Sequence, residues 1–160
     1  MNNGKFTLVK TGPETIDVEM EIVNSNKEYN VLSKDKEELT LQEVLQEIQE
    51  AEDVGAERYL IVEDGSSIGI TEILMHNPRD GYAWIGLFII KQELHHKGFG
   101  TRALNYIFEV LRERQVPVVR LGVIIDNELG HRFWIRQGFR AIEKKMSNEN
   151  KEVMVYDKEL

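Results

Sequence analysis

The feature that most constrains the fold is a short basic segment with two glycines, His95-His96-Lys97-Gly98-Phe99-Gly100-Thr101. It follows an apolar run at 84–90 and precedes a run at 102–114 whose apolar residues have helical spacing. The first amides of a helix lack partners inside the helix, and the helix dipole adds positive charge there. Glycine has no Cβ, so a phosphate can approach its backbone closely. The segment therefore indicates a phosphate site at a helix start, with a simple tight turn as the alternative.

Length and composition limit the class of protein. The chain has 160 residues, of which 41% are hydrophobic, and this predicts one globular domain over 1–160. It contains 0 cysteines, which excludes disulfides, a thiolate nucleophile and cysteine-ligated metals. No spacing of histidine and acidic residues indicates a metal site, so no metal is expected.

Charge and hydropathy narrow the partners. The net charge of -8 disfavours nucleic acid as a partner and is compatible with cationic partners such as amines. The apolar run at 83–90 is too short to span a bilayer, and the first ten residues contain no apolar signal core. We therefore expect a cytoplasmic protein that does not contact membranes.

Periodicity and turn residues predict a mixed order of elements. Strands are expected at 5–10, 58–63, 67–75, 82–90, 118–125, 139–146 and 152–158. Helices are expected at 13–23, 41–55, 100–115 and 129–137, with a long connection containing some helical turns at 24–40. Thr40 and Glu43 have the spacing of a capping box, and Asp64-Gly65 that of a hairpin turn. This order predicts an α/β (α+β) fold, a mixed, mostly antiparallel central sheet with helices on both faces.

Two motifs on these elements resemble the GNAT superfamily of acyl-CoA-dependent N-acetyltransferases. The family's phosphate loop has the form Gln/Arg-x-x-Gly-x-Gly/Ala, which His95 to Gly100 matches from its fourth position onward. The second motif is an asparagine, a small residue, an aromatic residue and Gly-Phe, here Asn127, Gly130, Trp134 and Gly138-Phe139. The resemblance extends from residue 57 to the end of the chain.

The resemblance implies acetyl-CoA as co-substrate, and it implies where acetyl-CoA binds. Main-chain groups at the end of the apolar strand would pair with the pantetheine arm. The glycine loop would hold the pyrophosphate, and Asn127 would contact the cofactor or order a water, a role compatible with that of a helix N-cap. The implied residues are Phe88, Ile89, Ile90, His95, His96, Lys97, Gly98, Phe99, Gly100, Thr101, Asn127 and Trp134.

The sequence departs from the family at the positions that usually move protons. His95 replaces the first residue of the loop, and the two usual base positions are Trp84 and Gly122. The usual tyrosine acid is replaced by Trp134, whose indole N–H donates a hydrogen bond but is not a usable acid. Proton-transfer roles therefore cannot be carried over from the family.

Glu72 is the candidate base that remains, because it interrupts the apolar stretch 68–75 on the strand beside the central one. The alternative is a solvent-facing strand residue. His131 and His76 are further base candidates, each also readable as a surface histidine, and His95 and His96 are either phosphate partners or solvated loop residues.

The sequence thus predicts an N-acetyltransferase that moves an acetyl group from acetyl-CoA to a primary amine of a small molecule or peptide. Direct attack in a ternary complex is expected, because no cysteine is present to carry the acyl group. One alternative is a non-catalytic acyl-CoA-binding or sensory module on the same fold. An ATP-binding protein is disfavoured, because the loop lacks P-loop spacing. A homodimer is left open.

Overall fold

The computed structural model describes residues 4–147 and 149–160, which form seven strands and five α-helices. The strands are β1 (Phe6–Lys10), β2 (Glu57–Glu63), β3 (Ser66–Leu74), β4 (Ala83–Ile90), β5 (Val118–Ile124), β6 (Arg140–Met146) and β7 (Glu152–Glu159). The helices are α1 (Ile16–Ser25), α2 (Lys27–Lys34), α3 (Leu41–Asp53), α4 (Phe99–Glu113) and α5 (Glu128–Arg136), with short 3-10 turns η1 (Pro13–Thr15) and η2 (Gln92–Leu94).

The strands form one sheet in the order β1-β2-β3-β4-β5-β7-β6. Neighbouring strands are antiparallel except β4 and β5, which are parallel and are joined through α4, since parallel strands require a long crossover. The predicted fold class, a mixed and mostly antiparallel sheet in an α/β protein, is confirmed.

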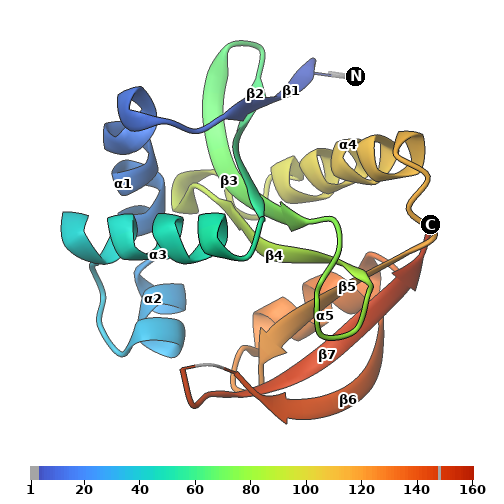
Figure 1. Ribbon diagram of the computed structural model, residues 1–160. Helices are drawn as coiled ribbons and strands as arrows, with labels where there is room; N and C mark the ends of the chain where they lie inside the picture. Colours follow the sequence, from blue (N-terminus) through green and yellow to red (C-terminus); the bar gives the residue numbers. More distant parts are fainter. Residues whose placement is uncertain (1–3, 148) are drawn as a thin grey trace.

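Helices cover both faces of the sheet, as predicted (Figure 1). On one face, α1 and α3 bury Ile22 and Val44 against Leu60 and Ile70 of the sheet. On the other face, the amphipathic helix α4 buries its apolar stripe against β4 and β5; that stripe is Ala103, Leu104, Ile107, Phe108 and Leu111. Below, these are called the α1/α3 face and the α4 face.

The region 24–40, predicted as a long connection with some helical turns, contains the helix α2 over Lys27–Lys34. The inward side of this region is polar: Asn26, Asn30 and Ser33 are buried. Asn30 donates to the carbonyls of Val23 and Glu37, so side-chain hydrogen bonds dock the helix where an apolar stripe would normally do so. A search for apolar periodicity cannot detect such a helix.

Local turn and cap predictions are confirmed. The Thr40 hydroxyl accepts from the Glu43 amide and the Glu43 carboxylate accepts from the Thr40 amide, which completes the capping box of α3. Asp64 and Gly65 have φ of 49° and 82°, as a type I′ hairpin turn requires.

A bulge in β4 changes the direction of its side chains. Glu72 of β3 pairs with Leu87, but the next residue, Ile73, pairs with Ile85, so Gly86 is the extra residue. Beyond the bulge, β4 separates from β5: the two strands pair only at Ala83–Val119 and Trp84–Arg120. The sheet is therefore split along the last six residues of β4.

Candidate active site

The split between β4 and β5 is lined by residues that leave it open. Gly86 on β4 and Gly122 on β5 are both exposed, although they lie on the two middle strands of the sheet. Gly122 is one of the two positions where the family resemblance implies a base, and here it has no side chain. The centre of the sheet is thus accessible at a place where an uninterrupted sheet would be closed.

The main-chain groups along this edge of β4 differ in availability. A Cβ on Gly69 would lie 2.3 Å from the carbonyl oxygen of Ile89, so that carbonyl points toward β3. Groups of alternate strand residues point to opposite edges, so those of Phe88 and Ile90 face away from β3. The Ile90 carbonyl already accepts from Asn26 Nδ2 at 3.1 Å and interacts with His95 Nε2 at 2.8 Å. Phe88 is therefore the residue whose main-chain groups face the split.

The glycine loop begins α4 with an unusual backbone. His96 and Gly98 have φ of 62° and 84°, and Gly98 is the N-cap of the helix. Alternation of left-handed and right-handed residues turns successive amides toward one concavity. The amides of residues 98–101 have no hydrogen-bond acceptor among the residues that the structure describes. The loop therefore has the backbone geometry of an anion site.

Side chains around this loop are only partly free. The His95 ring contacts the Ile90 carbonyl through Nε2, whereas His96 is exposed. Lys97 is exposed as well. The Thr101 hydroxyl accepts from Gln137 Nε2 at 3.0 Å. Arg102, a residue that the sequence analysis did not single out, folds back so that its Nη1 would lie 3.0 Å from a Cβ on Gly98.

The second motif forms the start of α5. Asn127 Oδ1 accepts from the Gly130 amide at 3.0 Å, so Asn127 is the N-cap. A Cβ on Gly130 would lie 2.5 Å from Asn127 Nδ2, which explains the small residue at this spacing. His131 is not free to act as a base: one ring nitrogen contacts the Ile125 carbonyl at 3.0 Å and the other the Tyr156 hydroxyl at 2.6 Å.

Trp134 belongs to an aromatic cluster on the α4 face. Its ring lies edge-on to Phe88 at 5.6 Å, to Phe133 at 5.0 Å and to Phe139 at 5.2 Å between centroids. Phe88 of β4 and Trp134 of α5 thus pack against each other beside the region where β4 separates from β5. Trp84 has a separate role, because its Nε1 donates to Asp80 and Lys145 lies over its ring.

Glu72 lies on the α1/α3 face, mostly buried, with 15% of its side chain exposed. Its Oε2 accepts from Arg58 Nη1 at 2.6 Å, and its Oε1 faces Gly86. Burial raises the pKa of the Glu72 carboxyl above its ordinary value, and the charge and hydrogen bond of Arg58 offset only part of that rise. Glu72 is therefore not the solvent-facing residue that the sequence left open.

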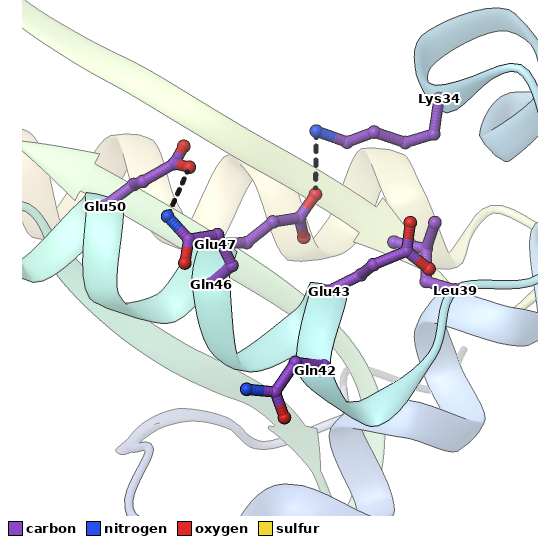
Figure 2. A pocket seen from close by; sticks show the side chains of 7 residues that line it. All are labelled: Lys34, Leu39, Gln42, Glu43, Gln46, Glu47 and Glu50. Carbon is purple, nitrogen blue, oxygen red and sulfur yellow. Dashed lines mark hydrogen bonds and ion pairs between the residues drawn. The ribbon is translucent and has the colours of Figure 1, made fainter.

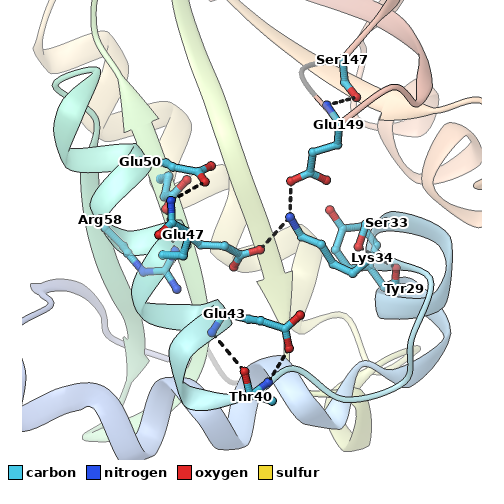
Figure 3. Close-up of polar contacts among 12 residues, drawn as sticks. Tyr29, Ser33, Lys34, Thr40, Glu43, Glu47, Glu50, Arg58, Ser147 and Glu149 are labelled. Atoms are coloured by element: carbon cyan, nitrogen blue, oxygen red, sulfur yellow. Dashed lines mark hydrogen bonds and ion pairs between the residues drawn. The ribbon is translucent and has the colours of Figure 1, made fainter.

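Tyr29 and Glu47 lie near Glu72 on the same face. Lys34 of α2 is paired with Glu47 of α3 at 3.1 Å and with Glu149 of the β6–β7 loop (Figure 3). Burial raises the pKa of Tyr29, and the negative charges of Glu47, Glu149 and Glu72 raise it further while Lys34 lowers it. These residues come from three separate elements, and around Tyr29 the negative charges of Glu47, Glu149 and Glu72 outnumber the positive charge of Lys34.

A hollow of about 330 Å³ opens beside this group, between α2 and α3 (Figure 2). Three of its lining residues are glutamates and one is a lysine; the full lining is Lys34, Leu39, Gln42, Glu43, Gln46, Glu47 and Glu50. Glu47 and Lys34 belong both to this hollow and to the group around Glu72. In the described part of the chain, no cluster of histidine and acidic residues could hold a metal ion.

Sequence reasoning missed Arg58, Glu19 and Arg102. A weak signal existed for the first two, since Arg58 shares its strand face with the apolar Leu60, and Glu19 shares its helix face with Ile22. Charged residues on two apolar faces predict a buried ion pair. The identity of the partners depends on how α1 docks on the sheet, which spacing alone does not show.

These features define a class of α/β fold in which a mixed sheet splits beside a glycine-containing helix start. The sequence profile described as Acetyltransferase (GNAT) family matches residues 21–139, and the chain belongs to this acetyltransferase family. The predicted enzyme class, acyltransferase, and the predicted superfamily are confirmed. No curated protein matches the sequence significantly.

Solved structures share the fold at low identity. An acetyltransferase from Thermus thermophilus superposes with a TM-score of 0.82 at 20% identity, and all of both chains is covered. The enzyme from Salmonella typhimurium that modifies the N-terminal serine of ribosomal protein L7/L12 gives 0.76 at 16% identity, covering 97% of this chain and 95% of that one. The PaiA N-acetyltransferase of Thermoplasma acidophilum, solved with coenzyme A, gives 0.67 at 16%, covering 98% and 99%.

Within residues 4–147 and 149–160, every helix is too short or too polar to cross a bilayer.

Proposed function

We propose that this protein transfers an acetyl group from acetyl-CoA to a primary amine of a small molecule or peptide, by direct attack in a ternary complex. The observation that carries the proposal is the buried carboxylate of Glu72, which faces the exposed Gly86 where β4 separates from β5. An amine at that split would reach a proton acceptor on one side and the open edge of β4 on the other.

The residues around the split fit acetyl-CoA. The free amides at the start of α4 suit a pyrophosphate, and Lys97 and Arg102 add positive charge beside them. The main-chain groups of Phe88 suit the amides of the pantetheine arm, whereas Ile89 and Ile90 contribute side-chain contacts. The full set proposed for acetyl-CoA is Phe88, Ile89, Ile90, His95, His96, Lys97, Gly98, Phe99, Gly100, Thr101, Arg102, Asn127 and Trp134.

Glu72 is proposed as the base. The amine arrives as an ammonium ion and gives one proton to Glu72. The raised pKa of the Glu72 carboxylate makes it a stronger proton acceptor. The amine nitrogen then forms a bond to the acetyl carbon, the carbon–sulfur bond breaks, and the second proton of the amine ends on the thiolate. Thiols have a pKa of roughly 8.5, so the thiolate leaves without a strong acid, and the indole of Trp134 suffices as a packing group.

The charge around Glu72 favours a cationic acceptor. Glu47, Glu149 and Glu72 outnumber Lys34 among the groups that act on Tyr29, and the adjacent hollow is acidic as well. An ammonium group gains from such surroundings, whereas a carboxylate acceptor would be repelled. Primary amines without a nearby acidic group are therefore the expected class.

The test is a panel of amines with detection of the released CoA thiol. Spermidine, benzylamine and a short peptide with a free N-terminal serine represent polyamines, simple amines and protein termini. Amine-dependent thiol release is expected for at least one of them, and glutamate serves as the acidic comparison. Tight binding of CoA without turnover of any amine would contradict the proposal and favour the acyl-CoA-binding module.

The role of Glu72 is tested in the same assay. Glu72→Gln is expected to lower turnover by about 10²-fold while leaving acetyl-CoA affinity nearly unchanged, because general-base catalysis contributes about this much. Glu128→Gln on the exposed start of α5 is the matched control. An effect of Glu72→Gln below threefold at every pH would remove Glu72 from the mechanism and leave a water chain as the proton acceptor.

The proposal also covers the number of domains, the location and the oligomeric state of the protein. The seven strands belong to one sheet, which supports a single N-acetyltransferase domain over residues 1–160. We further propose that the protein is cytoplasmic and is a monomer or a homodimer. Light scattering at micromolar concentration distinguishes the two assemblies.

A further inference from the structure

Three charged side chains from three elements form a chain of hydrogen bonds under the α1/α3 face. Arg58 of β2 donates from Nε to Glu19 Oε1 at 2.7 Å and from Nη1 to Glu72 Oε2 at 2.6 Å. Glu19 of α1 accepts a further hydrogen bond from the Thr15 hydroxyl at 2.9 Å. Only 1% of the Glu19 side chain and 5% of the Arg58 side chain are exposed. The guanidinium is thus held rigidly between two carboxylates.

The two carboxylates differ in how many of their oxygens are hydrogen-bonded. Both oxygens of Glu19 are occupied, one by Arg58 and one by Thr15, so Glu19 is an anchor. Glu72 has one oxygen on Arg58, and the other faces the glycine bulge of β4. One guanidinium also balances only one of the two negative charges, which leaves a buried excess of one charge at the split.

We propose that Arg58, anchored by Glu19, is a positioning residue for the acetyl transfer: it holds Oε2 of Glu72 so that Oε1 stays directed at the amine. This inference rests on the proposed function. The planar guanidinium of Arg58 directs one N–H at each of the two carboxylates in fixed geometry, which a lysine point charge does not do. Arg58 is further expected to set the proton affinity of Glu72 without touching substrate.

The groups around Glu72 act on its pKa in opposite directions. Burial is the largest effect and raises the pKa, Arg58 lowers it by charge and hydrogen bond, and Glu47 and Glu19 raise it. Tyr29 of α2 faces the same group, and Lys34 and Glu149 lie beyond it. Removing the charge of Arg58 and removing that of Glu19 should therefore shift the titration of Glu72 in opposite directions, which a merely structural role would not do.

The experiment compares Arg58→Gln with Glu19→Gln, and Glu21→Gln, exposed on the same helix, is the control. The carboxyl carbon of Glu72 is followed by NMR in protein labelled at glutamate, with the signal assigned by its loss in Glu72→Gln. We expect the midpoint to rise by at least half a pH unit in Arg58→Gln and to fall in Glu19→Gln. The acid limb of kcat/KM, measured with the best amine of the panel, should move in the same two directions.

Arg58→Lys keeps the positive charge but loses the planar group that bridges Glu19 and Glu72, and it serves if Arg58→Gln does not fold. Its acid limb should stay near that of wild type while kcat falls at least tenfold. Shifts that are absent, or that have the same sign in Arg58→Gln and Glu19→Gln, would overturn the inference, as would wild-type kcat in a folded Arg58→Lys protein. If wild type acetylates no amine, the proposed function fails, whereas the NMR titration still decides whether Arg58 and Glu19 control Glu72.

Discussion

The Oε1 atom of Glu72 lies 3.7 Å from the position that a Cβ would take on Gly86. The two residues face each other because the bulge in β4 turns Gly86 and Leu87 toward the same face of the sheet as Glu72. A glycine at this point keeps the carboxylate accessible from the split between β4 and β5. The bulge thus determines both the separation of the strands and the exposure of the proposed base.

Enlarging Gly86 tests this relationship. Gly86→Ala adds a methyl group at ordinary contact distance, and the fold and CoA binding should be preserved. Gly86→Leu should lower kcat/KM for the amine by at least tenfold, because its side chain would fill the space before Oε1. Isothermal titration with CoA and steady-state kinetics with the amine separate the two effects. Full amine turnover by Gly86→Leu would show that the acceptor does not approach Glu72 from this side.

The second prediction concerns the glycine loop. Gly98 has φ of 84°, and a Cβ there would lie 3.0 Å from Arg102 Nη1, so Gly98→Val should distort the free amides of α4. CoA affinity is expected to fall at least tenfold. Gly65→Val is the matched control. Gly65 has a similar φ of 82°, no atom lies near the position of an added Cβ, and it is distant in sequence from the glycine loop. Equal CoA affinities in the two variants, both folded, would refute the phosphate-loop assignment.

Trp134 should act through packing. Trp134 is partly buried, so its loss should cost less than the about 3–5 kcal/mol typical of a fully buried tryptophan. Trp134→Ala removes three edge-on aromatic contacts, so both its melting temperature and its acetyl-CoA affinity should fall. Trp134→Tyr should keep activity, because a phenol retains an aromatic ring and adds an acid. Ile135→Ala, at an exposed position of the same helix, provides the comparison. Wild-type stability and affinity in Trp134→Ala would show that the residue belongs neither to the core nor to the site.

The capping box of α3 predicts a pH dependence of stability. The hydrogen bond from Lys36, followed by those from Thr40, lowers the pKa of Glu43 from its ordinary 4.5 to about 2. A carboxyl whose pKa falls on folding stabilises the protein above its unfolded pKa, and that stabilisation is lost as the pH drops through the folded value. Glu43→Gln should therefore be less stable than wild type at pH 7, with the difference shrinking between pH 4.5 and 2. Urea unfolding at several pH values measures it, and a constant difference down to pH 2 would contradict the assignment.

Much of the fold followed from local rules. The amphipathic stripe of α4, the turn at Asp64-Gly65 and the capping box at Thr40 depend on neighbours in sequence, and all were predicted. For helix α2 only some helical turns were predicted, without bounds, because its inward side makes hydrogen bonds through Asn26 and Asn30, an arrangement that leaves no apolar period.

The site was less predictable than the fold, since its residues meet only through the tertiary structure. The glycine loop could be singled out because the phosphate site proposed there depends on backbone conformation, which a glycine such as Gly98 indicates directly. Glu72 drew attention as a charge in an apolar strand, but its contact with Arg58 and the bulge opposite it arise from strand register. Register is set by many weak contacts across the sheet, and a single sequence does not display them.

The ion pairs that join α2 to the β6–β7 loop have a consequence for biosynthesis. Lys34 meets Glu149 and Asp35 meets Lys151, contacts that span more than two thirds of the chain. On a ribosome, the first helices and the central strands emerge long before the last hairpin can reach them. The contacts between α2 and the β6–β7 loop therefore form only after β6 and β7 have emerged, and nascent chains that lack these strands would leave Lys34 without Glu149 and Asp35 without Lys151.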